Sequence, residues 1–142
     1  MRLITADDAE KIFEIQKDCF IGSELWTKKA LENFVSDKFT FGFIDEHGFI
    51  LCREIFDEVE IISFAVSPKF RRQGIGRRLM NAVIEKSNDK SVFLEVAENN
   101  FSAINLYMAV GFRQISKRAN YYQSQNGQQT AIVMKYENIR ET

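Results

Sequence analysis

Residues 64–80 read FAVSPKFRRQGIGRRLM, and this stretch decides how the rest of the chain is interpreted. It begins within an apolar run, residues 59–66, that is typical of a strand, and an amphipathic pattern after the glycines predicts a helix to about Ser87. Small residues such as Gly74 and Gly76 let backbone N–H groups approach an anion, and a helix N-terminus adds a partial positive charge. The stretch therefore suits a pyrophosphate, for which the neighbouring arginines would supply counter-charge.

The same pattern leaves an alternative open, because an isolated Gly-x-Gly is also typical of a tight turn at a helix N-terminus. A dinucleotide-binding fingerprint requires a third glycine where this chain has Leu79. It also requires an acid at the end of the next strand, whereas Glu95 lies mid-strand. The Gly-Lys-Ser/Thr sequence of a P-loop is missing. Neither nucleotide-binding fold fits, so phosphate binding is a hypothesis at this point.

Hydrophobic periodicity predicts the other elements. Thr5-x-x-Asp8 resembles a capping box at the start of the first helix, and Gly111 is expected as a left-handed cap after the last one. Helices are expected at residues 7–20 and 27–35, after the glycines, and at 102–110. Strands are expected at residues 2–5, 39–45, 49–55, 59–66, 92–97, 112–122 and 131–136. This order predicts an α+β fold with a mixed sheet and helices on both faces.

Composition narrows the class of protein. The chain has 142 residues, of which 45% are hydrophobic and 27% charged, and its net charge is -1, as expected for a single soluble domain over residues 1–142. Without a basic field we expect no direct contact with nucleic acid, and no stretch approaches the roughly 20 apolar residues of a membrane span. Two cysteines and no Cys/His pairing at ligand spacing predict no disulfide framework, no metal and a cytoplasmic location.

Two residues after the loop are candidates for chemistry. Glu95 is the one charged residue in the strand at 91–97, where a carboxylate is costly unless it is paired or solvated. Desolvation would raise its pKa toward what a general base needs, although a structural acid paired with an arginine fits the pattern equally well. Tyr107, on the following helix, is either a core residue or a functional group.

Together these motifs resemble a known family. Residues 64–76 are similar to the core acetyl-CoA motif of the GCN5-related N-acetyltransferases, whose signature Arg/Gln-x-x-Gly-x-Gly/Ala is met by Arg71, Gly74 and Gly76. Residues 100–112 resemble the family's next motif. The resemblance implies that family's fold, a mixed, mostly antiparallel sheet of about six to seven strands with helices on both faces. It also implies direct transfer of an acetyl group from acetyl-CoA to an amine.

The resemblance implies roles for individual residues as well. The end of the strand at 59–66 would splay from its neighbour and admit the pantetheine arm, and the Val66 N–H would stabilise the developing oxyanion. Glu95 would take a proton from the amine, and Tyr107 would protonate the leaving thiolate. The expected acetyl-CoA contacts are Phe64, Ala65, Val66, Arg71, Arg72, Gln73, Gly74, Ile75, Gly76, Arg77 and Asn100.

Within the family, the chain is similar to the ribosomal-protein-alanine N-acetyltransferases, which implies that the acceptor is the N-terminus of a ribosomal protein. The similarity rests on residues 94–96, 118–122 and 131–134. Trp26 resembles a tryptophan of that subgroup's substrate loop. Tyr121 and Tyr122 would wall a narrow slot for a chain end, or they simply pack on the sheet.

Three positions depart from that subgroup, all outside the cofactor loop: Leu25 stands for Pro, Ala97 for Arg and Thr130 for Asp. They leave the acceptor open, and a small-molecule amine such as a polyamine is the alternative substrate. A non-catalytic acyl-CoA-binding module is the third interpretation, but such a module has no need for an acid and a base like Tyr107 and Glu95. We expect a monomer or a weak dimer.

Overall fold

The computed structural model describes residues 1–20, 25–124 and 127–137, and the side chains of residues 120–129 lie outside that description. Along the chain the elements are β1 (Arg2–Leu3), a 3-10 turn (Ala6–Asp8), α1 (Ala9–Gln16), α2 (Lys28–Val35), β2 (Thr40–Asp45), β3 (Gly48–Ile55), β4 (Glu58–Val66), a 3-10 turn (Pro68–Phe70), α3 (Ile75–Ser87), β5 (Ser91–Ala97), α4 (Phe101–Val110), β6 (Arg113–Ser124) and β7 (Gly127–Tyr136).

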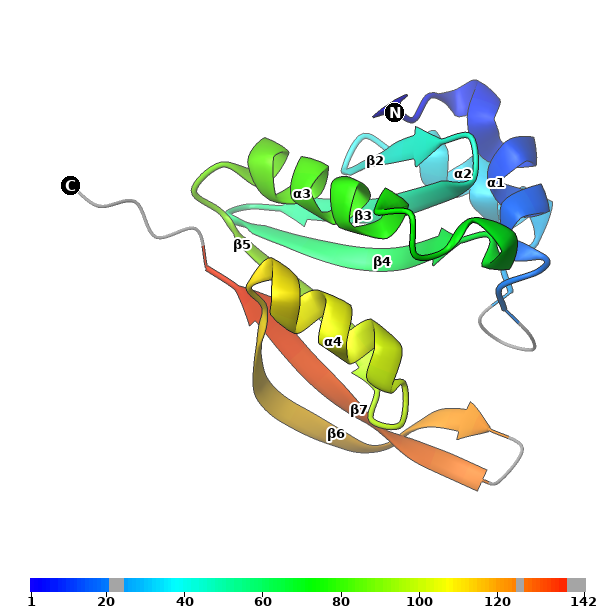
Figure 1. Cartoon of the computed structure of the whole chain (residues 1–142). Helices are drawn as coiled ribbons and strands as arrows, with labels where there is room; N and C mark the ends of the chain where they lie inside the picture. Colours follow the sequence, from blue (N-terminus) through cyan, green and yellow to red (C-terminus); the bar gives the residue numbers. More distant parts are fainter. Residues whose placement is uncertain (21–24, 125–126, 138–142) are drawn as a thin grey trace.

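Within the described residues, seven strands form one sheet in the order β1-β2-β3-β4-β5-β7-β6 (Figure 1). All neighbours are antiparallel except β4 and β5, which are parallel. Short turns can join antiparallel strands, whereas the parallel pair needs a crossover, which α3 supplies. The predicted α+β class with a mixed, mostly antiparallel sheet is therefore confirmed.

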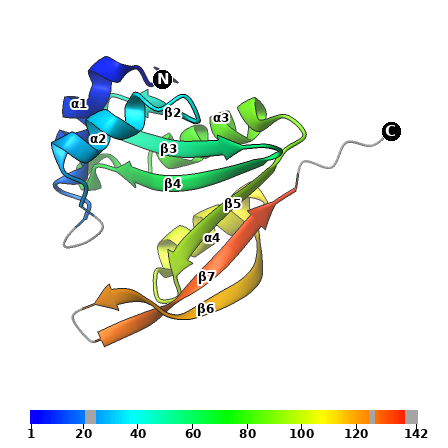
Figure 2. The ribbon, with the colours of Figure 1, turned by 180° about the vertical axis from the view of Figure 1, so that it is seen from behind.

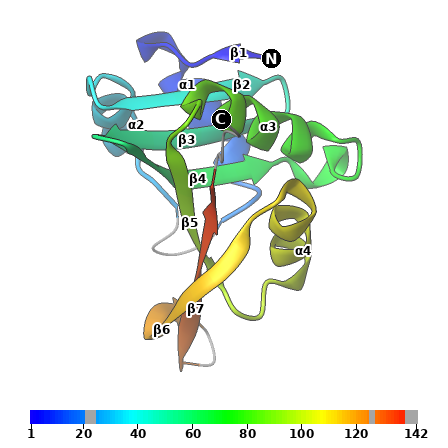
Figure 3. The ribbon, with the colours of Figure 1, turned by 90° about the vertical axis from the view of Figure 1, so that its left-hand side faces the viewer.

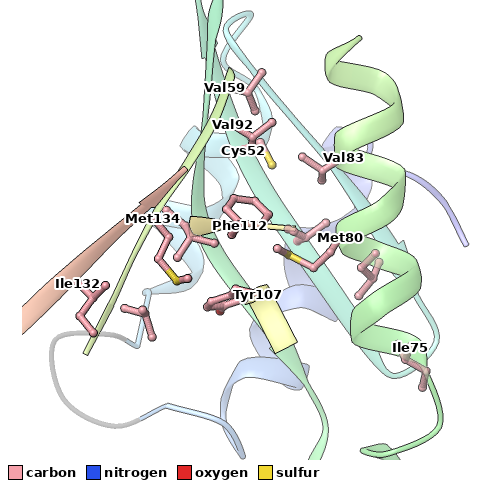
Figure 4. Packing of buried hydrophobic residues seen from close by; sticks show 14 residues of the cluster. Cys52, Val59, Ile75, Met80, Val83, Val92, Tyr107, Phe112, Ile132 and Met134 are labelled. Atoms are coloured by element: carbon pink, nitrogen blue, oxygen red, sulfur yellow. The ribbon is translucent and has the colours of Figure 1, made fainter. Parts of the chain in front are cut away.

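Helices cover both faces of the sheet, as the sequence predicts. α1 and α2 lie on one face, and α3 and α4 lie on the other (Figures 1 and 2). Met80 and Val83 of α3 pack in a buried cluster with side chains of β3, β4, β5 and β7 (Figure 4). A second cluster unites Ile12 of α1, Leu31 of α2 and Phe49 of β3. The sheet thus buries apolar surface on both sides, which stabilises the layered arrangement.

The first helix is shorter than the predicted span of residues 7–20. The expected capping box is present: the Thr5 N–H donates to the Asp8 carboxylate at 2.8 Å, and Arg2 pairs with the same carboxylate at 2.7 Å. The Arg2 hydrogen bond, reinforced by Thr5, lowers the pKa of Asp8 to about 2. At the other end, the Gln16 carbonyl accepts the N–H of Cys19, a donor three residues on. Such a bond tightens the last turn, and α1 ends there.

β4 and β5 are paired along only part of their length. Their parallel ladder holds three residue pairs, the last being Glu60 with Phe93. Beyond it, β4 stays with β3 and β5 stays with β7, so the two strands diverge (Figures 2 and 3). A register shift against β3 leaves Ile62 as an extra residue near this point, and a β-bulge bends its strand. The predicted splaying of residues 59–66 is therefore observed.

Candidate active site

The divergence of β4 and β5 opens a groove of about 390 Å³. Five of the predicted site residues line it, from four different parts of the chain: Trp26, Phe64, Glu95, Asn100 and Tyr107. The other lining residues are Phe20, Glu60, Ile61, Ile62, Ser63, Leu94, Val96 and Ala97. A larger hollow of about 480 Å³ adjoins the groove near the β3–β4 turn and shares Glu60, Leu94 and Glu95 with it. Because the candidate chemical groups gather in the smaller space, we take this groove as the candidate active site.

One edge of β4 faces this groove. β3 pairs with the opposite edge of β4 through Phe64, Ala65 and Val66. Among the strand pairings of the described residues, none joins β4 to β5 past Glu60. Apart from the Val66 carbonyl, which Arg71 and Cys19 contact, the backbone groups on that side of residues 61–66 are therefore available to an extended ligand, as the edge of a sheet is.

The glycine loop adopts the conformation that an anion-binding helix start requires. Gly74 has a left-handed φ of +82° and is the N-cap of α3. The first bond of α3 runs from the Arg78 N–H to the Gly74 carbonyl at 3.0 Å. A helix leaves the N–H groups before that bond without intrahelical partners, which here are those of Ile75, Gly76 and Arg77. Together with the helix dipole, these groups favour an anion at the loop.

Gly76 serves a different purpose from Gly74. A side chain there would place its Cβ 3.0 Å from the end of the Phe64 ring and 3.4 Å from a methyl group of Leu106. Glycine at this position therefore allows α3 to pack closely on β4 and α4. The sequence motif predicts both glycines as cofactor contacts, and the structure adds that the second one sets the distance between elements.

The arginines of the loop are not equivalent. The Nε of Arg71 donates to the Val66 carbonyl at 3.0 Å and so fastens the loop to the end of β4. Arg78 donates to the Gln73 carbonyl at 3.3 Å within the loop. Arg72 and Arg77 are exposed, so their charges face solvent beside the glycine loop. Arg72 also has a left-handed φ of +64°, which adds backbone strain to the loop.

Glu95 lies on β5 opposite Val133 of β7, at the wall of the groove. Its Oε1 accepts a hydrogen bond of 2.6 Å from Nη1 of Arg118 on β6. The Glu95 side chain is 20% exposed and that of Arg118 is 53% exposed, so the ion pair sits at the surface of the groove. The sequence left two interpretations of Glu95 open, and the structure shows a paired carboxylate that also borders the groove. Sequence reasoning missed Arg118 as a site residue because its partner lies two strands away.

Asn100 and Tyr107 are both fixed by their positions on α4. The Asn100 side chain caps the helix by accepting the Ala103 N–H at 3.3 Å. The buried Tyr107 ring lies 6.2 Å from Phe64 and from Phe112, measured between ring centroids. The Tyr107 carbonyl accepts the N–H of Gly111 at 3.1 Å, where a φ of +121° confirms the predicted left-handed cap. The tyrosine is therefore both a core residue and part of the groove wall.

Trp26 lies on the groove wall contributed by the α1–α2 segment. Its ring meets Phe34 of α2 edge to face, with centroids 5.2 Å apart. Its backbone is bound by the side chain of Gln16, a residue that the periodicity marks only as part of a helix face. Tyr121 and Tyr122 belong to β6, but their side chains lie outside the described residues. The tyrosine slot therefore stays a prediction.

Neither cysteine is a good candidate nucleophile. Cys52 is fully buried, and burial raises the pKa of its thiol. Burial also raises the pKa of Cys19, whose single S–H can donate to either the Ile15 carbonyl at 3.4 Å or the Val66 carbonyl at 3.5 Å. Since the thiolate is the reactive form, both thiols are poorly reactive. The part of the chain with assigned positions contains no cluster of three metal-ligating side chains and no helix long and apolar enough to cross a membrane.

A family model described as the acetyltransferase (GNAT) family matches residues 9–112. The chain belongs to this family. This chain is 31% identical over 116 residues to the [ribosomal protein bS18]-alanine N-acetyltransferase of Escherichia coli strain K12. The alignment covers 77% of this chain and 78% of the relative. The expectation of an acyltransferase enzyme is therefore confirmed, and so is the resemblance to the ribosomal-protein-alanine subgroup.

Solved structures share the fold of this acetyltransferase. The crystal structure of the ribosomal-protein-S18-alanine N-acetyltransferase from E. coli superposes with a TM-score of 0.85 at 24% identity, covering 99% of this chain and 96% of that one. Arabidopsis thaliana NAA60 in complex with acetyl-CoA gives 0.79 at 20% identity, with coverages of 96% and 97%. A spermidine N-acetyltransferase chimera from Vibrio cholerae and hSSAT gives 0.80 at 18% identity, with coverages of 96% and 93%.

Proposed function

We propose that this acetyltransferase transfers an acetyl group from acetyl-CoA directly to the N-terminal amine of a protein, an alanine at the start of a ribosomal protein. The observation that carries the proposal is the groove between β4 and β5. Glu95 and Tyr107 lie in its walls, and Gly76 at the start of α3 lies against Phe64, another of its lining residues. The relative from E. coli that acts on the alanine of ribosomal protein bS18 supports the choice of acceptor.

The chain offers matching groups for the donor, acetyl-CoA. The left-handed Gly74 and the N-terminus of α3 suit its pyrophosphate, with the exposed Arg72 and Arg77 as counter-charges. The edge of β4 at residues 61–66 suits the amide-containing pantetheine arm, which can bond to it as an added strand would. The Val66 N–H is our candidate for stabilising the oxyanion, a contribution typically worth roughly 3 to 4 kcal/mol. The donor supplies an activated acetyl thioester.

In the proposed transfer, the nitrogen of the acceptor attacks the thioester carbonyl, so that a C–N bond forms while the C–S bond breaks. Glu95 receives the proton that the amine loses, directly or through one water. Arg118 holds the carboxylate at the groove wall through its 2.6 Å hydrogen bond. Tyr107 supplies a proton to the thiolate that leaves. A base and an acid flanking one groove are what such a reaction requires.

The choice of acceptor also has a physical reason. An α-amino group has a pKa near ~8, so about a tenth of it is neutral at pH 7, whereas a lysine amine near ~10.4 is neutral only about once in 2,500. Reaching the neutral form at pH 7 costs roughly 1.4 kcal/mol for the first and roughly 4.6 kcal/mol for the second. A single carboxylate such as Glu95 suffices for the smaller cost, which favours a chain end over a lysine.

Competition between acceptors tests this function. Two peptides of one sequence are mixed with enzyme and acetyl-CoA, one with a free N-terminal alanine and the other blocked there but carrying a lysine. We expect mass spectrometry to find the acetyl group on the free alanine peptide. Preferential acetylation of the lysine peptide would overturn the assignment. Spermidine, the substrate named for a neighbour of the same fold, is the third acceptor. Transfer to spermidine but to neither peptide would establish the small-molecule alternative.

A further inference from the structure

Gln16 is a fully buried polar residue at the end of α1. Both the oxygen and the nitrogen of its side-chain amide form hydrogen bonds to the backbone of Trp26. Its Oε1 accepts the Trp26 N–H at 2.9 Å, and its Nε2 donates to the Trp26 carbonyl. A residue of an adjacent β-strand would bond to the Trp26 backbone in the same way, through one donor and one acceptor. Here the side chain of Gln16 supplies both groups. The backbone of Trp26 is thereby held in place, ten residues away from the group that holds it.

The backbone of Gln16 fixes the other end of the same segment. Its carbonyl accepts the N–H of Cys19 at 2.9 Å and the N–H of Phe20 at 3.0 Å. One residue therefore anchors the chain on both sides of residues 21–24. Phe20 and Trp26, the two aromatic residues nearest these anchors, both line the groove. The contacts of Gln16 thus define a wall of the candidate active site that is separate from the glycine loop.

Packing alone does not explain a glutamine at this position. Gln16 lies beside the cluster that contains Ile15 and Leu31, where an apolar side chain of similar length would fill the same space. A buried amide is costly unless both of its atoms find partners, and here both are used on Trp26. The ring of Trp26 packs edge to face against Phe34. Because the indole is attached to the backbone that Gln16 holds, a shift of that backbone would move the indole away from this contact.

We propose that Gln16 is a positioning residue that sets the affinity for the acceptor by holding Trp26 and Phe20 in the groove wall. It acts through these two residues and does not touch the reacting atoms. The inference rests on the proposed function in one respect, that the α1–α2 side of the groove receives the acceptor. The donor loop on α3 is held by contacts that do not involve Gln16.

The test uses the full-length enzyme and two substitutions. Gln16→Met keeps the length of the side chain and removes both hydrogen bonds, which leaves the backbone N–H and carbonyl of Trp26 to seek water. Gln16→Glu keeps an acceptor for the Trp26 N–H and serves as a partial rescue. Ile12→Val, a buried change on the same helix, is the matched control for lost stability alone. The acceptor is the alanine peptide or, if the wild-type enzyme does not acetylate it, the amine that it does acetylate.

For Gln16→Met we expect the KM for the acceptor to rise about tenfold, the scale of one lost hydrogen bond or two. The KM for acetyl-CoA and kcat should stay within about twofold, and Gln16→Glu should recover part of the loss. Because Trp26 is the only tryptophan in the chain, its fluorescence reports the displacement directly. We expect a red-shifted emission for Gln16→Met and an unchanged one for Ile12→Val.

Three outcomes would overturn the inference. One is an unchanged acceptor KM in both Gln16 variants, with loss of thermal stability like that of Ile12→Val. Another is an equal rise in the KM for acetyl-CoA, which would mean a general disturbance of the groove. The third is an unchanged emission spectrum in Gln16→Met. If Gln16→Met does not fold, the acceptor and donor KM values of Gln16→Glu decide the question. A wild-type enzyme that ignores the peptide contradicts the proposed function instead, which separates the two failures.

Discussion

The loop at residues 71–76 follows the end of β4, and the wall that contains Trp26 and Glu95 lines the groove beside that strand. The two regions are built over different distances along the chain. The loop takes its shape from neighbours in sequence, such as the φ of Gly74 and the bond from Arg71 to Val66. The wall depends on contacts between distant elements, as in the pair of Glu95 with Arg118. A donor common to a whole family can be bound by such a local motif, whereas the proposed acceptor side is assembled by the fold.

The largest effect should come from the carboxylate of the wall. Glu95→Gln removes the proposed proton acceptor and the charge that pairs with Arg118, and losing a general base typically costs about 10² to 10⁴ in rate. Acetyl-CoA binding, measured by calorimetry, should be unchanged because the donor loop is intact. A turnover number close to that of the wild-type enzyme at pH 7 would show that Glu95 is a structural acid.

Tyr107→Phe tests the same side of the comparison with a smaller change. The ring contacts with Phe64 and Phe112 are retained, and only the hydroxyl is lost. We expect turnover to fall by about 10², the lower end for a lost general acid, with the melting temperature nearly unchanged. A wild-type rate combined with a lower melting temperature would assign Tyr107 to the core alone.

The features of the fold and the site that could be predicted from the sequence are those built by residues close together along the chain. The glycine loop, the cap at Gly111 and the order of helices and strands along the chain all leave local signatures in the sequence, so they could be predicted from it. The extent of the first helix could not, because residues 17–20 continue its pattern while a bond from the Cys19 N–H to the Gln16 carbonyl tightens its last turn. Arg118 belongs to a motif of the subgroup, but its pairing with Glu95 could not be predicted, since only the sheet order β5-β7-β6 brings the two residues together.

On the donor side, Gly74→Val should weaken acetyl-CoA binding by about tenfold or more, because a β-branched residue resists a φ of +82°. The same strain should lower stability by roughly 1–3 kcal/mol, so the melting temperature falls as well. Gly74→Asn is the matched control, since asparagine tolerates the left-handed region and should keep most of the affinity. Equal affinities for the valine variant and the wild type in calorimetry would contradict the anion site.

The smallest effect concerns the start of the helix that carries Gln16. The pKa of Asp8 is lowered from 3.8 to about 2, mainly by the hydrogen bond from Arg2, so the carboxylate stabilises the fold above about pH 4. The stabilisation is lost as the pH falls through about 2. Asp8→Asn should therefore lower the free energy of unfolding by about 2 kcal/mol at pH 7 in urea titrations. The difference from the wild type should vanish near the acid limit, and a constant difference at every pH would refute the charge as its cause.

The extra residue at Ile62 changes which side chains of β4 face each side of the sheet. Before it, Val59 and Ile61 face the cluster under α3, and after it Phe64 and Val66 face the same way, so the alternation of β4 slips by one. The strands part within two residues of that slip. The one extra residue of β4 therefore coincides with the opening of the sheet, and deleting Ile62 should close the groove before it unfolds the chain.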